Sequence, residues 1–342
     1  MKNISIYEAP VVISGLLSKY EKGHLWKAPE EIFGKVSEWV DIMRVRSTGG
    51  RVRFRTNTKK LWIRTTLKAC TPDVNFPIVG TAACDVLRGR GIEADYVGYV
   101  VPPEFGKVVG EREISLPGTM DDIAIYMPRN EEVEDIEIAI DDDAEILPPT
   151  PYTFEDPILY YGSSVTEGCT ATHPSCNFVA YTARWVDANF VNFGFSGSAL
   201  GEPSMAEIIA KQKMSAFVMD YDHNAETADD LRKTHENFFK IIRAAQPDLP
   251  IVMLTKANDY WHEYELLERR DVIRQTYENA IAAGDQNVYF VDNSDVFGTV
   301  GRFACTIDML HPNDIGFRLM SERLYPVLKE ALEKRYGKKI TI

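Results

Sequence analysis

The alternation of apolar and polar residues divides this chain into two parts of different character. Before about residue 150, short apolar segments are separated by turn residues, and Arg51–Arg55 alternates with a period of two, which predicts a strand. Further strands are predicted at 61–65, 94–101, 112–116, 122–127 and 136–140. Several short strands of this kind predict an antiparallel β-sandwich or jelly roll.

From Pro157 onward, apolar runs of strand length alternate with longer segments of helical period. The pattern predicts strands at 158–161, 190–193, 216–219, 251–254 and 288–291, and helices at 177–186, 227–245, 271–283 and 312–336. Repeated strand–helix units predict a parallel sheet with helices on both faces. The carboxyl ends of such strands meet at one edge, so residues distant in sequence can share one site there.

A change of composition marks the boundary between the two parts. The segment Glu131–Asp143 is acidic, and the proline-rich Leu147–Pro151 follows it. Such a stretch is typical of a linker. We therefore predict a β-sandwich domain over residues 1–150 and an α/β domain over residues 151–342, and a chain of 342 residues favours two domains.

The charge balance excludes some classes of partner. The formal net charge of −13 argues against nucleic-acid binding and against docking on anionic membranes. Neither an export signal nor a bilayer-spanning run is visible, so we expect a cytoplasmic protein. One local stripe is basic, and we expect it to be a solvated sheet face: Arg51, Arg53, Arg55, Lys59, Lys60 and Arg64.

The cysteines and acidic residues show no metal-binding spacing. There are five cysteines and no Cys-x-x-Cys pair, and we expect Cys169 and Cys176 to be free thiols in a reducing compartment. Asp220, Asp222 and His223 are close in sequence, but their spacing matches no common metal site. We expect neither a metal nor another cofactor.

Polar residues follow several predicted strands, where parallel strands would bring them to one edge. The four segments are Gly162-Ser163-Ser164, Asn192–Ser198, Asp220–Asn224 and Asp308-Met309-Leu310-His311. A serine hydroxyl needs a base to become a nucleophile, and His311 can accept its proton near neutral pH. Asp308 can accept a hydrogen bond from the second ring nitrogen of His311 and stabilise the imidazolium.

The order of these segments resembles the SGNH hydrolase superfamily, also called GDSL esterases, over residues 157–336. The resemblance implies a flavodoxin-like, three-layer hydrolase domain after the sandwich. It assigns Ser164 as nucleophile and His311 and Asp308 as its partners. The oxyanion hole would be formed by the N–H groups of Ser164 and Gly197 and the amide of Asn224.

The chain departs from the family pattern at two places. Ser163 replaces an aspartate that is not itself the nucleophile, so the chemistry is retained. Asp222 and Ala225 replace the glycine and aspartate that flank the asparagine of the family. Asn258 is a rival for that asparagine, but it follows the fourth strand, whereas the family asparagine follows the third. The Gly-x-Ser-x-Gly motif of α/β-hydrolases is absent around Ser164.

The resemblance implies a serine esterase. A β-sandwich before an SGNH domain is similar to two-domain carbohydrate esterases, notably those of family two, which favours removal of short acyl groups, above all acetyl, from a small-molecule or oligosaccharide ester. His223, Tyr260 and Trp261 are predicted to contact the substrate. The alternatives are a lipase, lysophospholipase or thioesterase, for which no apolar lid is visible, and a non-catalytic glycan-binding protein. Homo-oligomerisation is left open.

Overall fold

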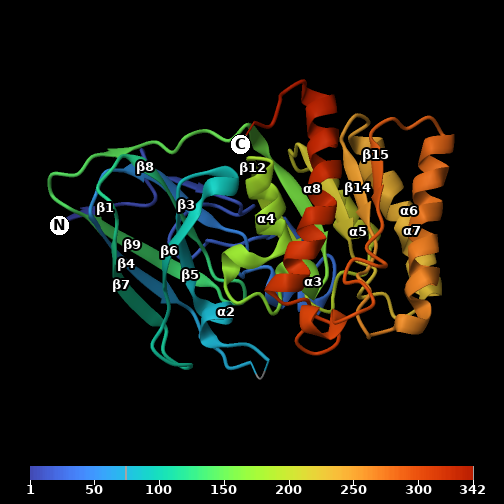
Figure 1. Cartoon of the computed structure of the whole chain (residues 1–342), viewed down its shortest axis with the longest axis horizontal. Coiled ribbons are helices and arrows are strands. Elements are labelled where there is room, and N and C mark those ends of the chain that lie inside the picture. The colour runs from blue at the N-terminus through green and yellow to red at the C-terminus, as the bar shows by residue number, and fades with distance from the viewer. Residues whose placement is uncertain (74, 342) are drawn as a thin grey trace.

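The computed structural model describes residues 1–73 and 75–341. A mostly β part and an α/β part lie side by side, with the N-terminal strands at one end of the molecule and α6 (Ala228–Ala245) and α7 (Leu266–Ala282) at the other (Figure 1).

The N-terminal part is a sandwich of two antiparallel sheets, as predicted. One sheet has the strand order β1-β9-β4-β7, and the other has the order β10-β3-β8-β5-β6, with β2 paired to β3. Val52 and Phe54 from the second sheet and Ile63 and Ile138 from the first are buried in one shared core. The strands are β1 (Lys2–Ile4), β2 (Val12–Ser14), β3 (Arg51–Thr56), β4 (Lys60–Leu67), β5 (Cys84–Arg88), β6 (Asp95–Val100), β7 (Val109–Ser115), β8 (Asp121–Tyr126), β9 (Val133–Ile140) and β10 (Ile146–Leu147).

Four of these strands were not predicted from the sequence. β1, β2 and β10 have three residues or fewer, too few to show a period. In β5, four of five residues are buried, including Asp85. Asp85 Oδ2 accepts a hydrogen bond from the N–H of Ser175 at 2.8 Å, so this strand packs against the α/β part and lacks the usual alternation.

The expectation of a solvated basic stripe is wrong for two of its members. Arg51 is fully buried, and one of its Nη atoms donates to the carbonyl of Phe190 at 3.0 Å. Arg53 is 8% exposed and lies with its guanidinium 3.5 Å from the centre of the Tyr152 ring. Both side chains point from β3 onto the α/β part, because hydrogen bonds and ring faces there satisfy the charges.

The α/β part contains one parallel sheet of strand order β12-β11-β13-β14-β15. Its strands are β11 (Phe154–Gly162), β12 (Ala188–Gly194), β13 (Ala216–Asp220), β14 (Ile251–Leu254) and β15 (Val288–Val291). All five predicted strands are therefore present. Counted along the chain, the order is 2-1-3-4-5, which is that of flavodoxin-like folds.

Helices cover both faces of this sheet. The side chains of α4 and α8 pack on one face, and those of α5, α6 and α7 on the other. α4 (Phe178–Trp185) and α6 begin within one residue of the predicted positions because side chains cap them: Asn177 accepts from Ala180 N–H, and Thr227 from Asp230 N–H. α7 begins at Leu266, earlier than the predicted start at residue 271, and no side chain of the described residues caps it. The remaining helices are α1 (Glu38–Met43), α2 (Ile78–Ala82), α3 (Ser164–Glu167), α4 (Phe178–Trp185), α5 (Pro203–Ala210) and α8 (Asp314–Tyr336), with short 3₁₀ turns η1 (Glu30–Ile32), η2 (Gly91–Glu93), η3 (Pro174–Cys176), η4 (Glu263–Glu265) and η5 (Arg302–Cys305).

One segment of the N-terminal part belongs to the core of the α/β part. Ala28, Ile32, Val40 and Met43 are buried in the same cluster as the side chains of α5 and α6. The division at residue 150 stays a prediction, but the packing already crosses it. Among the residues that the structure describes, no helix combines the length and the apolar character needed to cross a bilayer.

Candidate active site

The parallel sheet reverses its winding at β11, which lies between β12 and β13. In open α/β sheets, ligands bind at the carboxyl ends of the strands where the order reverses. Ser164 lies two residues after the end of β11 and is the first residue of α3, and its residue surface is 9% exposed. The neighbouring Ser163 caps this single turn by accepting a hydrogen bond from the N–H of Val165 at 3.1 Å.

Buried polar side chains hold α3 on both neighbouring strands. Thr166 Oγ1 donates to Asp220 Oδ2 at 2.8 Å, at the end of β13. Asn192 Nδ2 donates to the carbonyl of Thr166 at 2.8 Å, from β12. A Cβ on Gly194 would lie 2.3 Å from the backbone nitrogen of Glu167, so only glycine permits this approach. The position of Ser164 is thus determined by contacts with three strands.

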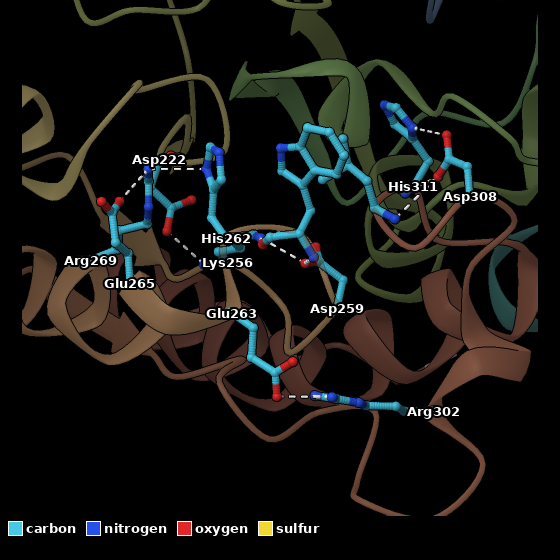
Figure 2. Close-up of polar contacts among 12 residues, drawn as sticks. Asp222, Lys256, Asp259, His262, Glu263, Glu265, Arg269, Arg302, Asp308 and His311 are labelled. Atoms are coloured by element: carbon cyan, nitrogen blue, oxygen red, sulfur yellow. Dashed lines mark hydrogen bonds and ion pairs between the residues drawn. The ribbon is translucent and has the colours of Figure 1, made fainter.

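His311 and Asp308 complete a chain of hydrogen bonds with Ser164. Ser164 Oγ lies 2.8 Å from His311 Nε2, and His311 Nδ1 lies 2.7 Å from Asp308 Oδ2. Figure 2 shows the His311 ring and the Asp308 carboxylate directed toward each other. The second oxygen, Asp308 Oδ1, accepts from the N–H of His311 at 2.8 Å and of Leu310 at 3.1 Å. The structure therefore brings the three residues together in the geometry of an activated serine.

The hydrogen bonds keep Asp308 ionised. Burial alone would raise the pKa of its carboxyl, but the backbone and ring N–H donors of His311 and the N–H of Leu310 outweigh this and lower the pKa below its ordinary value of 3.8. A carboxylate in this position favours the His311 tautomer that leaves Nε2 free to accept a proton.

The two other predicted oxyanion-hole residues line the same cleft as Ser164. Gly197 has a φ of +69°, a left-handed conformation that favours glycine. Among residues 1–73 and 75–341, no group accepts a hydrogen bond from its N–H. Asn224 donates one amide hydrogen to the carbonyl of Phe195 at 3.2 Å, so its second amide hydrogen is available to a ligand.

A buried arginine holds the loop that bears Asn224. Arg269, on α7, is fully buried, and one Nη atom donates to the carbonyls of Asp222 at 2.7 Å and Ala225 at 2.8 Å. Its other Nη atom donates to the carbonyl of Glu226 at 3.0 Å. The same atom donates to the Glu265 carboxylate at 2.8 Å (Figure 2). The motif pattern did not reveal this residue, because it lies on a helix remote in sequence from the loop.

The rival asparagine has a different environment. Asn258 Nδ2 donates to the carbonyl of Gly298 at 2.7 Å, and its Oδ1 accepts from the N–H of Phe297 at 2.6 Å. Both ends of this amide hold the loop after β15, and Asn258 does not line the Ser164 cleft. The geometry therefore favours Asn224 over Asn258 as a partner of the substrate.

The cleft at Ser164 has a volume of about 420 Å³, and the sandwich part forms much of its wall. Sequence motifs gave no sign of these residues, which lie in loops between the sandwich strands. They are Arg46, Asp73, Asn75, Phe76, Arg129 and Asn130. The N-terminal part is therefore a component of the site.

An ion cluster joins the two parts behind the serine. The Glu167 carboxylate of α3 is fully buried and accepts from Lys27 Nζ at 3.1 Å and Arg46 Nη1 at 2.9 Å. Burial would raise the pKa of Glu167, but Lys27, Arg46 and Arg129 reverse this and hold it well below its ordinary value of 4.5. Burial also lowers the pKa of Lys27 to about 8. Glu167 thus stays a carboxylate beside the active-site turn.

The remaining predicted residues do not line the cleft. Tyr260 and Trp261 are 38% and 49% exposed on the loop after β14, and Tyr260 N–H donates to the carbonyl of Met309 at 3.0 Å. The ring nitrogens of His223 are buried without a hydrogen-bond partner in the described residues. Burial, ahead of the nearby Lys256 and His311, lowers its pKa well below 6.5. The substrate-contacting role of these three residues stays a prediction.

One further feature is a group of side chains of the kind that bind metal ions. The side chains of Asp220, Asp222 and His223 converge, with one ligand-type atom of each within 4.8 Å of the others, although their spacing is unlike that of common metal sites. The positively charged Lys256 and Arg269 lie close by and oppose a cation there.

Cys169 and Cys176 are free cysteines, and Cys169 Sγ accepts from Arg129 at 3.3 Å.

The profile of the GDSL-like lipase/acylhydrolase family matches residues 155–329, and a second profile, described as the N-terminus of Esterase_SGNH_hydro-type, matches residues 2–146. The first match spans more than half of the chain, which therefore belongs to the GDSL-like lipase/acylhydrolase family, as its motifs predicted. No curated protein sequence matches this chain.

Solved structures share the fold over nearly the whole chain. A protein described as a GDSL-like lipase from Bacteroides ovatus superposes with a TM-score of 0.83 at 22% identity, covering 94% of this chain and 96% of its own. The salicylyl-acyltransferase SsfX3 from a tetracycline biosynthetic pathway gives 0.80 at 19% identity, covering 97% and 98%. A family two carbohydrate esterase from Clostridium thermocellum, in complex with cellohexaose, gives 0.58 at 15% identity, covering 83% and 93%.

Proposed function

We propose that this protein is a serine esterase in which Ser164, His311 and Asp308 act together. The observation that supports this most directly is the pair of hydrogen bonds, 2.8 Å from Ser164 to His311 and 2.7 Å from His311 to Asp308, in a cleft that also contains Gly197 and Asn224.

The reaction proceeds in two half-reactions. Ser164 Oγ attacks the ester carbonyl carbon while His311 Nε2 takes its proton, and the oxyanion is stabilised by the N–H groups of Ser164 and Gly197 and the amide of Asn224. His311 then gives the proton to the leaving alcohol oxygen as the carbon–oxygen bond breaks. Water attacks the acyl-enzyme by the same route, releasing the acid and restoring the Ser164 hydroxyl.

The substrate we propose is a short acyl ester, above all acetyl, on a carbohydrate. Small or polar residues, including Ser196, Gly197 and Asn224, line the cleft beside Ser164, and Phe76 and Leu310 are its large apolar side chains. Each methylene that a groove buries contributes about 0.8 kcal/mol, and two apolar side chains provide only a short contact surface, so we expect short acyl chains to be preferred. The likeness in fold to carbohydrate esterases of family two is consistent with a sugar as the alcohol.

A larger acyl group is the second candidate, and one observation favours it. The loop between β15 and α8, which also carries His311, exposes three apolar side chains: Val300, Phe303 and Met309 are 94%, 72% and 58% exposed. The hydrophobic pattern of the sequence showed no lid here. Such a surface could cover an apolar or aromatic acyl group.

A panel of acyl chain lengths separates the two candidates. For short-chain specificity we expect kcat/KM to fall from p-nitrophenyl acetate to butyrate and to octanoate, and acetylated oligosaccharides to exceed all three. Octanoate as the best substrate would favour the larger acyl group, and a Val300→Ser, Phe303→Ser variant should then lose the octanoate activity selectively.

A further inference from the structure

Two arginines from the sandwich part face the cleft that contains Ser164. Arg46 precedes β3, and Arg129 follows β8, and both line the cleft together with His311. Neither belongs to a motif that the esterase mechanism uses. Their place in the cleft raises the question of which substrate group they contact.

The hydrogen-bonding capacity of these arginines is incompletely used. Arg129 is only 4% exposed, and one Nη atom donates to Cys169 Sγ at 3.3 Å. Its Nε and other Nη atom have no partner among the described residues, and its guanidinium lies 4.7 Å from the centre of the Phe76 ring. A buried guanidinium with unused donors is costly unless a ligand satisfies it.

The nearby carboxylates do not accept hydrogen bonds from the unused donors of Arg129. Glu167 already accepts from both Lys27 and Arg46, so three cations surround one fully buried carboxylate. Within the described residues, Arg129 forms no salt bridge.

Two further acidic residues belong to this region. Asp73 lines the cleft, and its Oδ1 accepts from the N–H of Asn75 at 3.1 Å. Glu131 is buried and acts electrostatically on Arg46 and Arg129, but within the described residues it forms no salt bridge with either, and its Oε1 accepts from the N–H of Thr71 at 3.0 Å. The side chain of Arg46 is 21% exposed, which leaves donors beyond its bond to Glu167 open to the cleft.

We propose that the cleft recognises an ester whose substrate carries a carboxylate near the scissile bond, bound by Arg46 and Arg129. This inference rests on the proposed esterase function and narrows its substrate class. Arginine suits the task because its planar donors match the two oxygens of a carboxylate. The carboxylate belongs to the alcohol, as in an acetylated sugar acid, or to the acyl group, as in a dicarboxylic half-ester.

Matched substrates test the charge on each side of the ester. On the alcohol side, kcat/KM is compared for glucuronic acid and glucose acetylated at the same hydroxyl. On the acyl side, it is compared for mono-p-nitrophenyl succinate and p-nitrophenyl butyrate, which have the same chain length. We expect a preference of at least about tenfold for the anionic member of one pair, the worth of one charge-assisted hydrogen bond. The pair that shows it identifies the source of the carboxylate.

Variants test whether the arginines cause the preference for the anionic substrate. Arg46→Gln and Arg129→Gln should each reduce the anionic-to-neutral ratio toward one, and Arg46→Lys should retain part of it. Arg64→Gln is the matched control, because it removes the same charge from the outer face of β4, where Arg64 pairs with Glu137 at 3.7 Å, and should leave the ratio unchanged. If Arg129→Gln fails to fold, the wild-type ratios still show whether the anionic substrate is preferred, and the Arg46 variants show whether an arginine causes the preference.

A binding measurement separates this inference from the esterase function. Calorimetry on Ser164→Ala protein compares glucuronate with glucose, and succinate with butanol, and needs no turnover. Ester hydrolysis that depends on Ser164, with equal rates in both pairs, would overturn the anion site alone. Preferential binding of an anion without any ester hydrolysis would overturn the esterase and keep the anion site. If the enzyme shows no preference for the anionic substrates and Ser164→Ala protein does not bind the anions preferentially, the inference is overturned altogether.

Discussion

Ser163 and Ser164 are adjacent hydroxyls with different surroundings, and this difference predicts different mutational effects. Ser164 Oγ contacts His311, whereas Ser163 Oγ accepts from the N–H of Val165. Ser164→Ala should reduce kcat by about 10⁴-fold or more with an unchanged melting temperature. Ser163→Ala should keep substantial activity and lose about 1 kcal/mol of stability, as for other caps. Hydrolysis of p-nitrophenyl acetate and thermal unfolding measure both, and near-normal turnover by Ser164→Ala would contradict the mechanism.

The ionisation of Asp308 leads to a prediction about pH. Because its hydrogen bonds lower its pKa, Asp308 stays a carboxylate at acid pH values where an ordinary aspartic acid begins to be protonated. We therefore expect kcat/KM to fall toward acid pH in a single protonation step, that of the base that accepts the proton of Ser164. Asp308→Asn should lower kcat by up to about 10⁴-fold, because the amide disfavours the required tautomer. A pH–rate profile checks both, and an acid limb involving two protons would count against this assignment.

At the scale of elements, Arg269 connects α7 to the loop of Asn224 by several hydrogen bonds. Lysine cannot replace these planar donors, so Arg269→Lys should lower stability by about 2–4 kcal/mol. It should also lower kcat, by up to about 10³-fold if Asn224 no longer reaches the oxyanion.

The neighbouring Arg270→Lys is the control for this prediction. Within the described residues, the salt bridge of Arg270 is to the adjacent Asp271, at 2.8 Å, so Arg270 should tolerate the change. Urea unfolding and steady-state kinetics distinguish the two variants. Equal stability and equal kcat of the two variants would show that Arg269 does not position the loop that bears Asn224.

At the scale of the whole molecule, the Lys27–Glu167 ion pair connects the two parts in the interior. Removal of one partner leaves a buried charge, so Lys27→Met should destabilise the protein by about 3–5 kcal/mol. The double variant Lys27→Met, Glu167→Gln should recover part of this loss. Unfolding in urea measures the free energy of unfolding of each variant. If the losses of the two single variants simply add in the double variant, Lys27 and Glu167 do not stabilise the protein as a pair.

The same pair gives stability a pH dependence. The folded-state pKa of Glu167 lies below its ordinary value of 4.5. Its contribution to stability is therefore complete above pH 4.5 and is lost as the pH falls below that value. Glu167→Gln should flatten the acid side of the stability profile.

The sequence by itself determined the five strands of the parallel sheet, most of the sandwich strands and the catalytic candidates of this protein. Apolar runs bounded by turn residues located all five strands of the parallel sheet, because buried strands are recognisable from short-range pattern. The Asp308–His311 spacing and the position of Ser164 after a strand identified residues that the fold brings within hydrogen-bond distance.

Only the tertiary structure decided which residues from the sandwich part enter the site. Lys27 and Arg46 lie more than a hundred residues before the turn at Ser164, and Arg129 lies in a different part of the fold, after β8. No periodic pattern in the sequence encodes such contacts. Arg51 resembled an exposed residue of an amphipathic strand, yet it is buried because the α/β part covers that face of the sheet. Burial of a charge depends on what packs against it, and that is determined only when the two parts of the chain meet.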